Sequence, residues 1–290
     1  MRAAFADIID YAGLFPPASC TMDDAVRQYD VYRRSADRWM LGRFVLAATR
    51  LEELALSIAR QRILLDSADP WHLSVVIGAN TTADLGLIDG FEAAANPGIV
   101  ADAIEAKVVS PAGGMVLAEQ ITARRQRYFE VPGTGPYIDL LAGIRRAGAV
   151  AKIRTGGMSP ELFPATADVA LFLKAVIATD VPFKATAGLH HPYRGCYPIS
   201  YASDAERQVM YGFVNLLVAV AQLRRDPDDE SVAAVLESPR DAFRWSAAGV
   251  MWRERLFGNS DLVAARSYFS SFGSCSFREP VDELGVAATT

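Results

Sequence analysis

The chain has 290 residues, of which 51% are hydrophobic and 22% are charged. These proportions are ordinary for a globular protein, and they exclude a disordered chain, a collagen-like repeat and a disulfide-stapled miniprotein. The formal net charge is −5, and basic residues cluster only in pairs such as Arg124-Arg125 and Arg145-Arg146. Because a nucleic-acid-binding protein needs a basic surface to neutralise phosphates, we expect no nucleic-acid partner.

The sequence shows no pattern of a membrane or secreted protein. No uncharged apolar stretch reaches the length of about 18 residues that a spanning helix needs, and residues 213–223 would cross only about half a bilayer. The first ten residues contain Asp7 and Asp10, whereas a signal peptide has an apolar segment there. Three widely spaced cysteines form no Cys-X-X-Cys pair. We therefore expect a cytoplasmic protein with reduced thiols and no membrane partner.

Short apolar runs alternate along the chain with longer segments of helical periodicity. The apolar runs predict strands over residues 3–9, 43–48, 73–78, 104–109, 128–131, 150–154 and 183–187. Helices are predicted between them over residues 22–36, 50–64, 82–95, 114–127, 136–147 and 160–179. Several of these strands are apolar at nearly every position, which is typical of a parallel sheet covered by helices on both faces.

The regular alternation of strand and helix predicts a parallel α/β fold. An open doubly wound sheet and a closed barrel compete, but the glycine fingerprint of dinucleotide binding is missing after the first strand. We therefore expect a single (β/α)8 TIM-barrel domain over residues 1–290, with its eighth strand at 272–276. An extended helical region is expected over 195–265, as an elaboration between the last two strands. Its predicted helices cover residues 204–223, 229–236 and 241–257.

Lysine is scarce in this chain, and its positions are unusual. There are four lysines against 25 arginines, and Lys107, Lys152 and Lys184 all fall in predicted strands. Lysine is depleted in strands and is rarely buried without a partner or a task. In a structural account, these lysines neutralise carboxylates such as Glu105 and Glu130.

In a chemical account, Lys152 and Lys184 point into the mouth of the barrel, where strand ends bring catalytic groups together. Each lysine is followed by a threonine and then by glycine, in the segments K-I-R-T-G-G and K-A-T-A-G. Two neighbouring ammonium groups repel and a dry pocket disfavours charge, so both effects lower a lysine pKa. A neutral lysine attacks a carbonyl carbon to form a Schiff base, which arginine cannot do because it stays protonated.

These segments resemble the deoxyribose-phosphate aldolase family, class I aldolases that fold as TIM barrels. Residues 152–157 are similar to the family's strand-six K-T-S-T-G motif, which bears the Schiff-base lysine. Residues 184–188 are similar to the strand-seven motif, whose second lysine lowers the pKa of the first. Residues 9–16 and 272–276 are similar to the family's opening segment and its last phosphate loop. The chain departs from the family at strand four, where Lys107 stands at the position expected for an acidic proton relay.

The resemblance implies a lyase that forms or cleaves a C–C bond next to a carbonyl through a lysine Schiff base. Lys152 is the predicted nucleophile, Lys184 lowers its pKa, and Glu130 or His190 moves protons. The substrate is expected to be a small anionic aldehyde or ketone. Whether it carries a phosphate group stays open. No cofactor and no metal are expected, because the protonated imine is itself the electron sink. Residues expected to bind the substrate are Asp10, Lys107, Arg154, Thr155, Gly156, Gly188, Gly273 and Ser274.

Two other functions stay open at this point. His190 and His191, together with a carboxylate, suit the metal of a zinc-, iron- or manganese-dependent TIM-barrel hydrolase or isomerase. Alternatively, the chain is a non-catalytic pseudoenzyme that binds a small molecule in an anion pocket. A homo-oligomer is a further alternative, because barrel enzymes often associate. Its interface is predicted at the aromatic group Trp252, Phe257, Tyr268 and Phe269.

Overall fold

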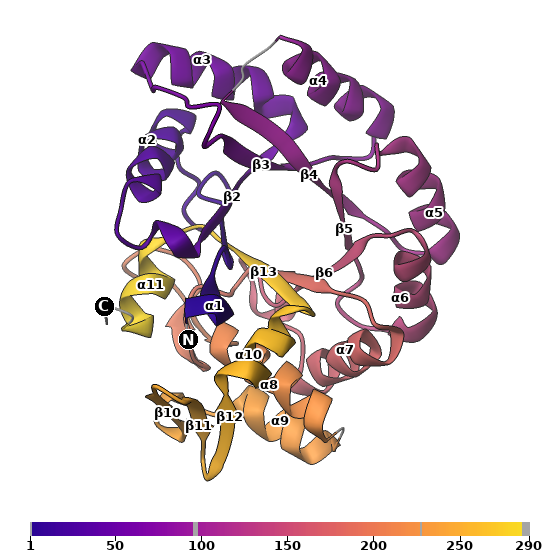
Figure 1. The fold of residues 1–290 in the computed structure, drawn as a ribbon, viewed down its shortest axis with the longest axis vertical. Coiled ribbons are helices and arrows are strands. Elements are labelled where there is room, and N and C mark those ends of the chain that lie inside the picture. The colour runs from indigo at the N-terminus through magenta and orange to yellow at the C-terminus, as the bar shows by residue number, and fades with distance from the viewer. Residues whose placement is uncertain (1, 95–97, 227, 286–290) are drawn as a thin grey trace.

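A closed barrel of eight parallel strands forms the centre of the protein (Figure 1). The computed structural model describes residues 2–94, 98–226 and 228–285. Strands follow one another around the barrel in the order β1-β13-β7-β6-β5-β4-β3-β2, and each neighbouring pair is parallel. The predicted TIM barrel is therefore confirmed. The strand bounds are β1 Ile9–Tyr11, β2 Leu41–Ala47, β3 Trp71–Val76, β4 Ile99–Lys107, β5 Gln126–Glu130, β6 Val150–Arg154, β7 Phe183–Thr186 and β13 Phe269–Ser274.

Helices connect successive strands and cover the outside of the barrel in Figure 1. The Thr21 hydroxyl caps the first of them by accepting a hydrogen bond from the Asp24 N–H. The predicted end of the third helix at Ala95 lies outside the described residues. Helix α5 ends at Gln120, so the predicted helix over 114–127 is wrong beyond that residue. The bounds are α2 Met22–Arg33, α3 Leu51–Gln61, α4 Thr81–Ala93, α5 Pro111–Gln120, α6 Tyr137–Arg146 and α7 Thr166–Thr179.

The predicted first strand is wrong over most of its length. Residues Arg2–Phe5 form the short helix α1, and strand pairing begins only at Ile9. The ring of Phe5 is fully buried and packs edge-on against the rings of Phe213 and Trp245. The apolar residues at the start of the chain therefore serve helix packing, and not a barrel strand.

The region between β7 and β13 contains helices and also two small antiparallel sheets. The predicted helix over 241–257 is wrong, because this segment forms three strands whose side chains alternate with period two. The predicted helix over 204–223 is wrong before residue 213, because residues 207–210 form the second strand of a hairpin. Figure 1 shows α8 to α10 and β10 to β12 gathered at one side of the barrel. The bounds are β8 Gly195–Pro198, β9 Arg207–Met210, α8 Phe213–Arg225, α9 Asp229–Glu237, β10 Phe243–Ser246, β11 Gly249–Trp252, β12 Arg255–Gly258 and α10 Asn259–Arg266, with α11 Arg278–Leu284 after the last strand.

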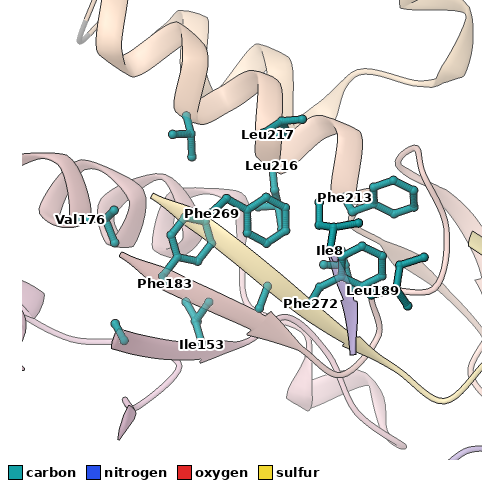
Figure 2. Close-up of a cluster of buried hydrophobic side chains, with 14 of the residues drawn as sticks. Ile8, Ile153, Val176, Phe183, Leu189, Phe213, Leu216, Leu217, Phe269 and Phe272 are labelled. Atoms are coloured by element: carbon teal, nitrogen blue, oxygen red, sulfur yellow. The ribbon is translucent and has the colours of Figure 1, made fainter. Parts of the chain in front are cut away.

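Helix α8 packs the inserted region onto the barrel (Figure 2). Its residues 213–223 are all buried, as expected for a helix that is apolar on every side. The ring of Phe213 stacks on Phe272 of β13 with 4.7 Å between centroids, and Phe269 stacks on Phe183 at 5.0 Å. Because Trp252, Phe257 and Phe269 are buried within this chain, the aromatic group predicted as a subunit interface belongs mostly to the core.

Residues 160–179 are long and apolar enough, by length and composition, to cross a membrane. In the structure this segment is divided into a short 3-10 helix at Pro160–Leu162 and the 14-residue helix α7. A helix of 14 residues spans about 21 Å, which is less than the hydrocarbon core of about 30 Å. Helix α7 lies in the ring of helices around the barrel (Figure 1).

Candidate active site

A cavity of about 410 Å³ opens at the carboxyl ends of the barrel strands. This size lies within the range of small-molecule sites, and the position is where TIM-barrel enzymes bind their substrates. Residues 198–201, in the turn of the β8–β9 hairpin, line the cavity on one side. The predicted residues that line it are Lys107, Glu130, Lys152, Arg154, Gly188, His190 and Gly273.

Lys152 lies at the floor of this cavity, on β6. Its Nζ atom is 2.8 Å from Glu105 Oε2 on β4 and 2.8 Å from Glu130 Oε2 on β5. The side chain is 8% exposed, so the ammonium group meets the cavity with little surface open to solvent. Strand pairing sets Glu130 beside Lys152 and Lys152 beside Lys184. The two lysines therefore lie side by side on neighbouring strands, but the prediction that both point into the mouth of the barrel is wrong for Lys184, which is not among the residues that line the cavity.

Lys184 lies deeper, inside the barrel and away from the cavity lining. Its Nζ atom is 2.5 Å from Asp10 Oδ2 and 2.7 Å from Glu105 Oε1, and it lies 5.0 Å from the centre of the Tyr128 ring. Burial lowers the pKa of the amine, but the carboxylates of Asp10 and Glu105 outweigh burial and raise that pKa above its usual range. Lys184 therefore carries a permanent positive charge.

The predicted role of Lys184 needs correction for this reason. Repulsion between two amines was expected to lower the pKa of Lys152, yet Glu105 stands between the two ammonium groups and bonds to both. The carboxylate neutralises the charge that would have caused the repulsion. Lys184 acts here as the fixed countercharge of two buried carboxylates.

Glu105 is the centre of the site, although the sequence analysis treated it only as a neutralising carboxylate. It is 2% exposed and accepts hydrogen bonds from both lysines and from the Ser74 hydroxyl. Burial raises its pKa, but Lys152 and Lys184 lower the pKa further, so Glu105 is ionised throughout the neutral range. The resemblance offered a signal for it, because that family has an acidic proton relay on strand four.

Asp10 was predicted to bind substrate, but it lies beneath the cavity floor. Its Oδ2 atom accepts hydrogen bonds from Lys184 and from the Ser271 hydroxyl, and its Oδ1 atom accepts one from the Arg43 N–H. With all its acceptors used inside the barrel, Asp10 is a structural partner of Lys184. We call the sequence of contacts Asp10–Lys184–Glu105–Lys152–Glu130 the ion-pair chain.

The glycine turns after β6 and β7 were predicted to hold an anion, and their interior is already filled by protein atoms. A Cβ atom on Gly156 would lie 2.6 Å from the Phe163 ring and 3.1 Å from the Gly188 Cα. Gly188 itself has a φ of +68°, which explains why glycine is needed there. The Thr155 hydroxyl donates to the carbonyl of Ala187, so it is also engaged. Gly156 and Thr155 therefore pack one turn against the other. Of the three residues predicted in these turns, Thr155, Gly156 and Gly188, the cavity lining includes Gly188.

The residues at the end of β13 also contact other groups of the protein. Gly273 lines the cavity, but a Cβ atom there would lie 2.9 Å from the Thr186 hydroxyl oxygen. The Ser274 hydroxyl donates to the carbonyl of Ser276 and lies 3.2 Å from His190 Nδ1. Ser274 thus fixes the wall of the cavity rather than facing a ligand.

The two histidines at the cavity face different partners. His190 is buried beside Ser274 and Cys275, and burial lowers its pKa to about 4, so the ring is neutral at pH 7. His191 Nδ1 lies 2.9 Å from the Glu283 carboxylate, and its ring stacks on Tyr197. Among the described residues no three His, Cys, Asp or Glu side chains gather closely enough to hold one ion.

Comparisons with known proteins do not add to this description: no family model, no curated protein and no solved structure matches the chain.

Proposed function

We propose that the protein is a lyase that forms or cleaves a C–C bond next to a carbonyl through a Schiff base on Lys152. The observation that carries the proposal is the position of Lys152 Nζ at the cavity floor, 2.8 Å from each of two carboxylates. Carboxylates close to a lysine amine can accept its proton and can stabilise the cation that forms when the amine becomes an imine.

The reaction begins with transfer of one proton from Lys152 to Glu130. The Nζ lone pair attacks the carbonyl carbon, the C=O π electrons move to oxygen, and that oxygen takes up one proton from the nitrogen. Glu130 then returns its proton to the hydroxyl group so that this group can leave as water. Loss of water then gives the protonated imine, whose nitrogen carries the positive charge that the ammonium group carried before. Glu105 remains ionised because its pKa is held low, so it neutralises the cation in both states.

Cleavage uses the protonated imine as the acceptor of an electron pair. The bond between the α and β carbons breaks, its electron pair moves toward the iminium nitrogen, and a carboxylate removes the proton of the β-hydroxyl group. The products are an aldehyde and an enamine, and hydrolysis of the enamine returns the free lysine. Glu105 and Glu130 both lie within hydrogen-bond distance of the reacting nitrogen. Glu130 is placed to accept the β-hydroxyl proton, while Glu105 stays ionised and neutralises the iminium cation.

The other lysines suit this role less well. Lys184 is 1% exposed, lies outside the cavity lining and has a raised pKa, so its amine is neither accessible nor neutral. Lys107 lines the cavity, but its side chain is exposed, and within the described part of the chain no carboxylate lies at ion-pair distance to accept its proton. Lys174 belongs to α7, on the outside of the barrel.

Reductive trapping tests the proposal directly. The protein is treated with borohydride in the presence of small aldehydes and ketones, and the modified peptides are mapped by mass spectrometry. With only four lysines in the chain, each adduct is assigned to one residue. We expect an adduct on Lys152, with the mass of the carbonyl compound less one water plus two hydrogens.

Two variants sharpen this test. Lys152→Met is expected to abolish both the adduct and any retro-aldol turnover, whereas Lys174→Met, on the outer helix, is expected to leave both unchanged. Labelling that disappears in Lys174→Met but persists in Lys152→Met would refute the proposal. If Lys152→Met binds a carbonyl compound with unchanged affinity, and no compound forms an adduct on the parent protein, the result would favour a non-catalytic pseudoenzyme.

We also propose a cytoplasmic location, because all three cysteines, each within the described residues, carry free thiols.

A further inference from the structure

Two cations at the rim of the cavity have no carboxylate partner. Lys107 and Arg154 lie at the ends of β4 and β6, each two residues after a member of the ion-pair chain on its own strand. Because side chains two residues apart on a strand share a face, both cations stand one layer above Glu105 and Lys152. Among the described residues neither makes an ion pair, although Lys107 is paired with Glu130 in strand register. They flank β5 and face the same cavity.

The charges around the cavity limit the ligand that these cations can hold. Glu105, Glu130 and Glu279 contribute three carboxylates to the lining, and Lys107, Lys152 and Arg154 contribute three cations. A phosphate dianion would enter a space whose charges are already balanced. A carboxylate brings one negative charge and two oxygens, which match a guanidinium and an ammonium group.

The turn after β6 is also crowded by protein side chains. Phosphate binding commonly uses several free N–H groups of a glycine turn. Here Phe163 packs into the turn at Gly156, and a Cβ atom on Gly157 would lie 2.4 Å from the Leu162 side chain. The Thr155 N–H is already bonded to the carbonyl of Thr186. The side-chain space of the turn after β6 is therefore filled by Phe163 and Leu162, which reduces the room for a phosphate group beside it.

The remaining walls of the cavity are mainly apolar. They include residues from the loop after β1, from the ends of β2 and β3, and from the segment after β6. Such walls bind hydrocarbon and do not provide the hydrogen bonds that the hydroxyl groups of a sugar require. The apolar lining residues are Phe15, Val45, Val76, Met158, Leu162, Ile199 and Met210.

We propose that the substrate is a small oxo acid with an apolar body, and not a phosphorylated sugar. This inference rests on the proposed imine chemistry at Lys152. The carbonyl carbon lies at Lys152 Nζ, the carboxylate binds between Lys107 and Arg154, and the hydrocarbon part lies against Val45, Val76 and the neighbouring apolar walls. Lys107 and Arg154 therefore determine specificity and take no part in the bond making.

The test compares initial rates of borohydride trapping on Lys152 with four probes: 2-oxohexanoate, 4-oxohexanoate, 2-hexanone and glyceraldehyde 3-phosphate. Each rate is divided by the rate of the same probe with Nα-acetyl-lysine amide, which removes differences in intrinsic reactivity. We expect at least one oxo acid to react at least tenfold faster than the ketone and the phosphate ester.

A double variant, Lys107→Gln with Arg154→Gln, separates anion recognition from imine chemistry. We expect it to lower the oxo-acid rate about tenfold and to leave the ketone rate within a factor of two, because Lys152 and its carboxylates are unchanged. Circular dichroism of the variant checks that the barrel is folded.

The outcomes distinguish failure of this inference from failure of the proposed function. If glyceraldehyde 3-phosphate labels Lys152 fastest, or if the double variant slows the ketone as much as the oxo acid, the substrate class is wrong while the imine on Lys152 stands. If no probe labels Lys152, both the substrate class and the proposed function are refuted.

Discussion

Replacing Lys184 with methionine tests how strongly the ion-pair chain stabilises the barrel. The methionine has a similar length but no charge, so the carboxylates of Asp10 and Glu105 lose the cation that lies 2.5 Å and 2.7 Å from them. Removing one partner of a buried ion pair costs about 3–5 kcal/mol. The lower end of this range is expected, because Asp10 keeps its bond from Ser271 and Glu105 keeps Lys152.

Thermal unfolding and urea titration measure this loss. A chain of 290 residues has an unfolding entropy of about 0.6 kcal/mol per kelvin, at about 2.1 cal/mol per kelvin per residue. A loss of about 3–5 kcal/mol therefore lowers Tm by about 5–8 °C. Lys107→Met, at an exposed position with no ion pair among the described residues, is the matched control, and we expect it to change stability by less than about 0.5 kcal/mol.

The loss of stability caused by Lys184→Met, called the deficit below, should also depend on pH in a defined direction. The raised pKa of Lys184 means that its stabilisation is complete below its ordinary pKa of 10.5 and is lost only as the pH rises through the folded value. The lowered pKa of Glu105 means that its stabilisation is complete above the ordinary value of 4.5 and is lost as the pH falls. We therefore expect the deficit of Lys184→Met to be largest between about pH 5 and 10, and about 1 kcal/mol smaller at pH 4.

A second variant tests whether the loss of stability is due to the unpaired charges. Adding Asp10→Asn to Lys184→Met removes one of the two carboxylates left without their cation, and we expect the double variant to regain at least about 1 kcal/mol. A deficit below about 1 kcal/mol at pH 7, or no recovery in the double variant, would show that the buried charges do not determine the stability of the barrel.

Three further predictions concern the walls of the cavity. The pKa of His190 is lowered to about 4, so its ring should show no NMR titration between about pH 5.5 and 8. The contribution of His190 to stability should be lost as the pH falls from about 6.5 to 4. A titration midpoint near pH 6.5 would contradict the burial of the ring. Burial raises the pKa of the Cys275 thiol to about 11, so at pH 8 iodoacetamide should alkylate the exposed Cys196 at least tenfold faster, and equal rates would refute this. Gly156→Ala should cost about 1–3 kcal/mol, because its Cβ would lie 2.6 Å from an aromatic ring, whereas Gly133→Ala, with open space around it, should be neutral in the same urea titration.

The barrel was predictable because its strands carry a strong local signal. Nearly continuous apolar runs such as residues 73–76 and 150–153 are typical of strands buried on both faces, and both runs lie in barrel strands. The prediction failed where apolar residues have another task. Residues 243–252 alternate with period two in two short strands, but the interpretation there assumed the helical period of neighbouring segments.

The candidate site was only partly predictable. Lys152 and Lys184 stand out because lysine is scarce and rarely occupies strands, and strand pairing does place them side by side. Only the resemblance pointed to an acid on strand four. The contact of Glu105 with Lys184 could not be predicted, since it joins residues 79 positions apart and depends on the register of the two intervening strands, β5 and β6. The glycines at 156 and 188 show a similar limit, because the same residue type serves loop packing and ligand approach equally well.

The ion-pair chain has a consequence for how the protein assembles. Its first carboxylate, Asp10, meets an amine 174 residues later, and the last barrel strand supplies the Ser271 hydroxyl that completes the contact. A nascent polypeptide that has produced only the first four strands holds Glu105 and Asp10 without either cation. We therefore expect Asp10 and Glu105 to become buried only when β6 and β7 bring the two lysines, because burial of uncompensated carboxylates is unfavourable.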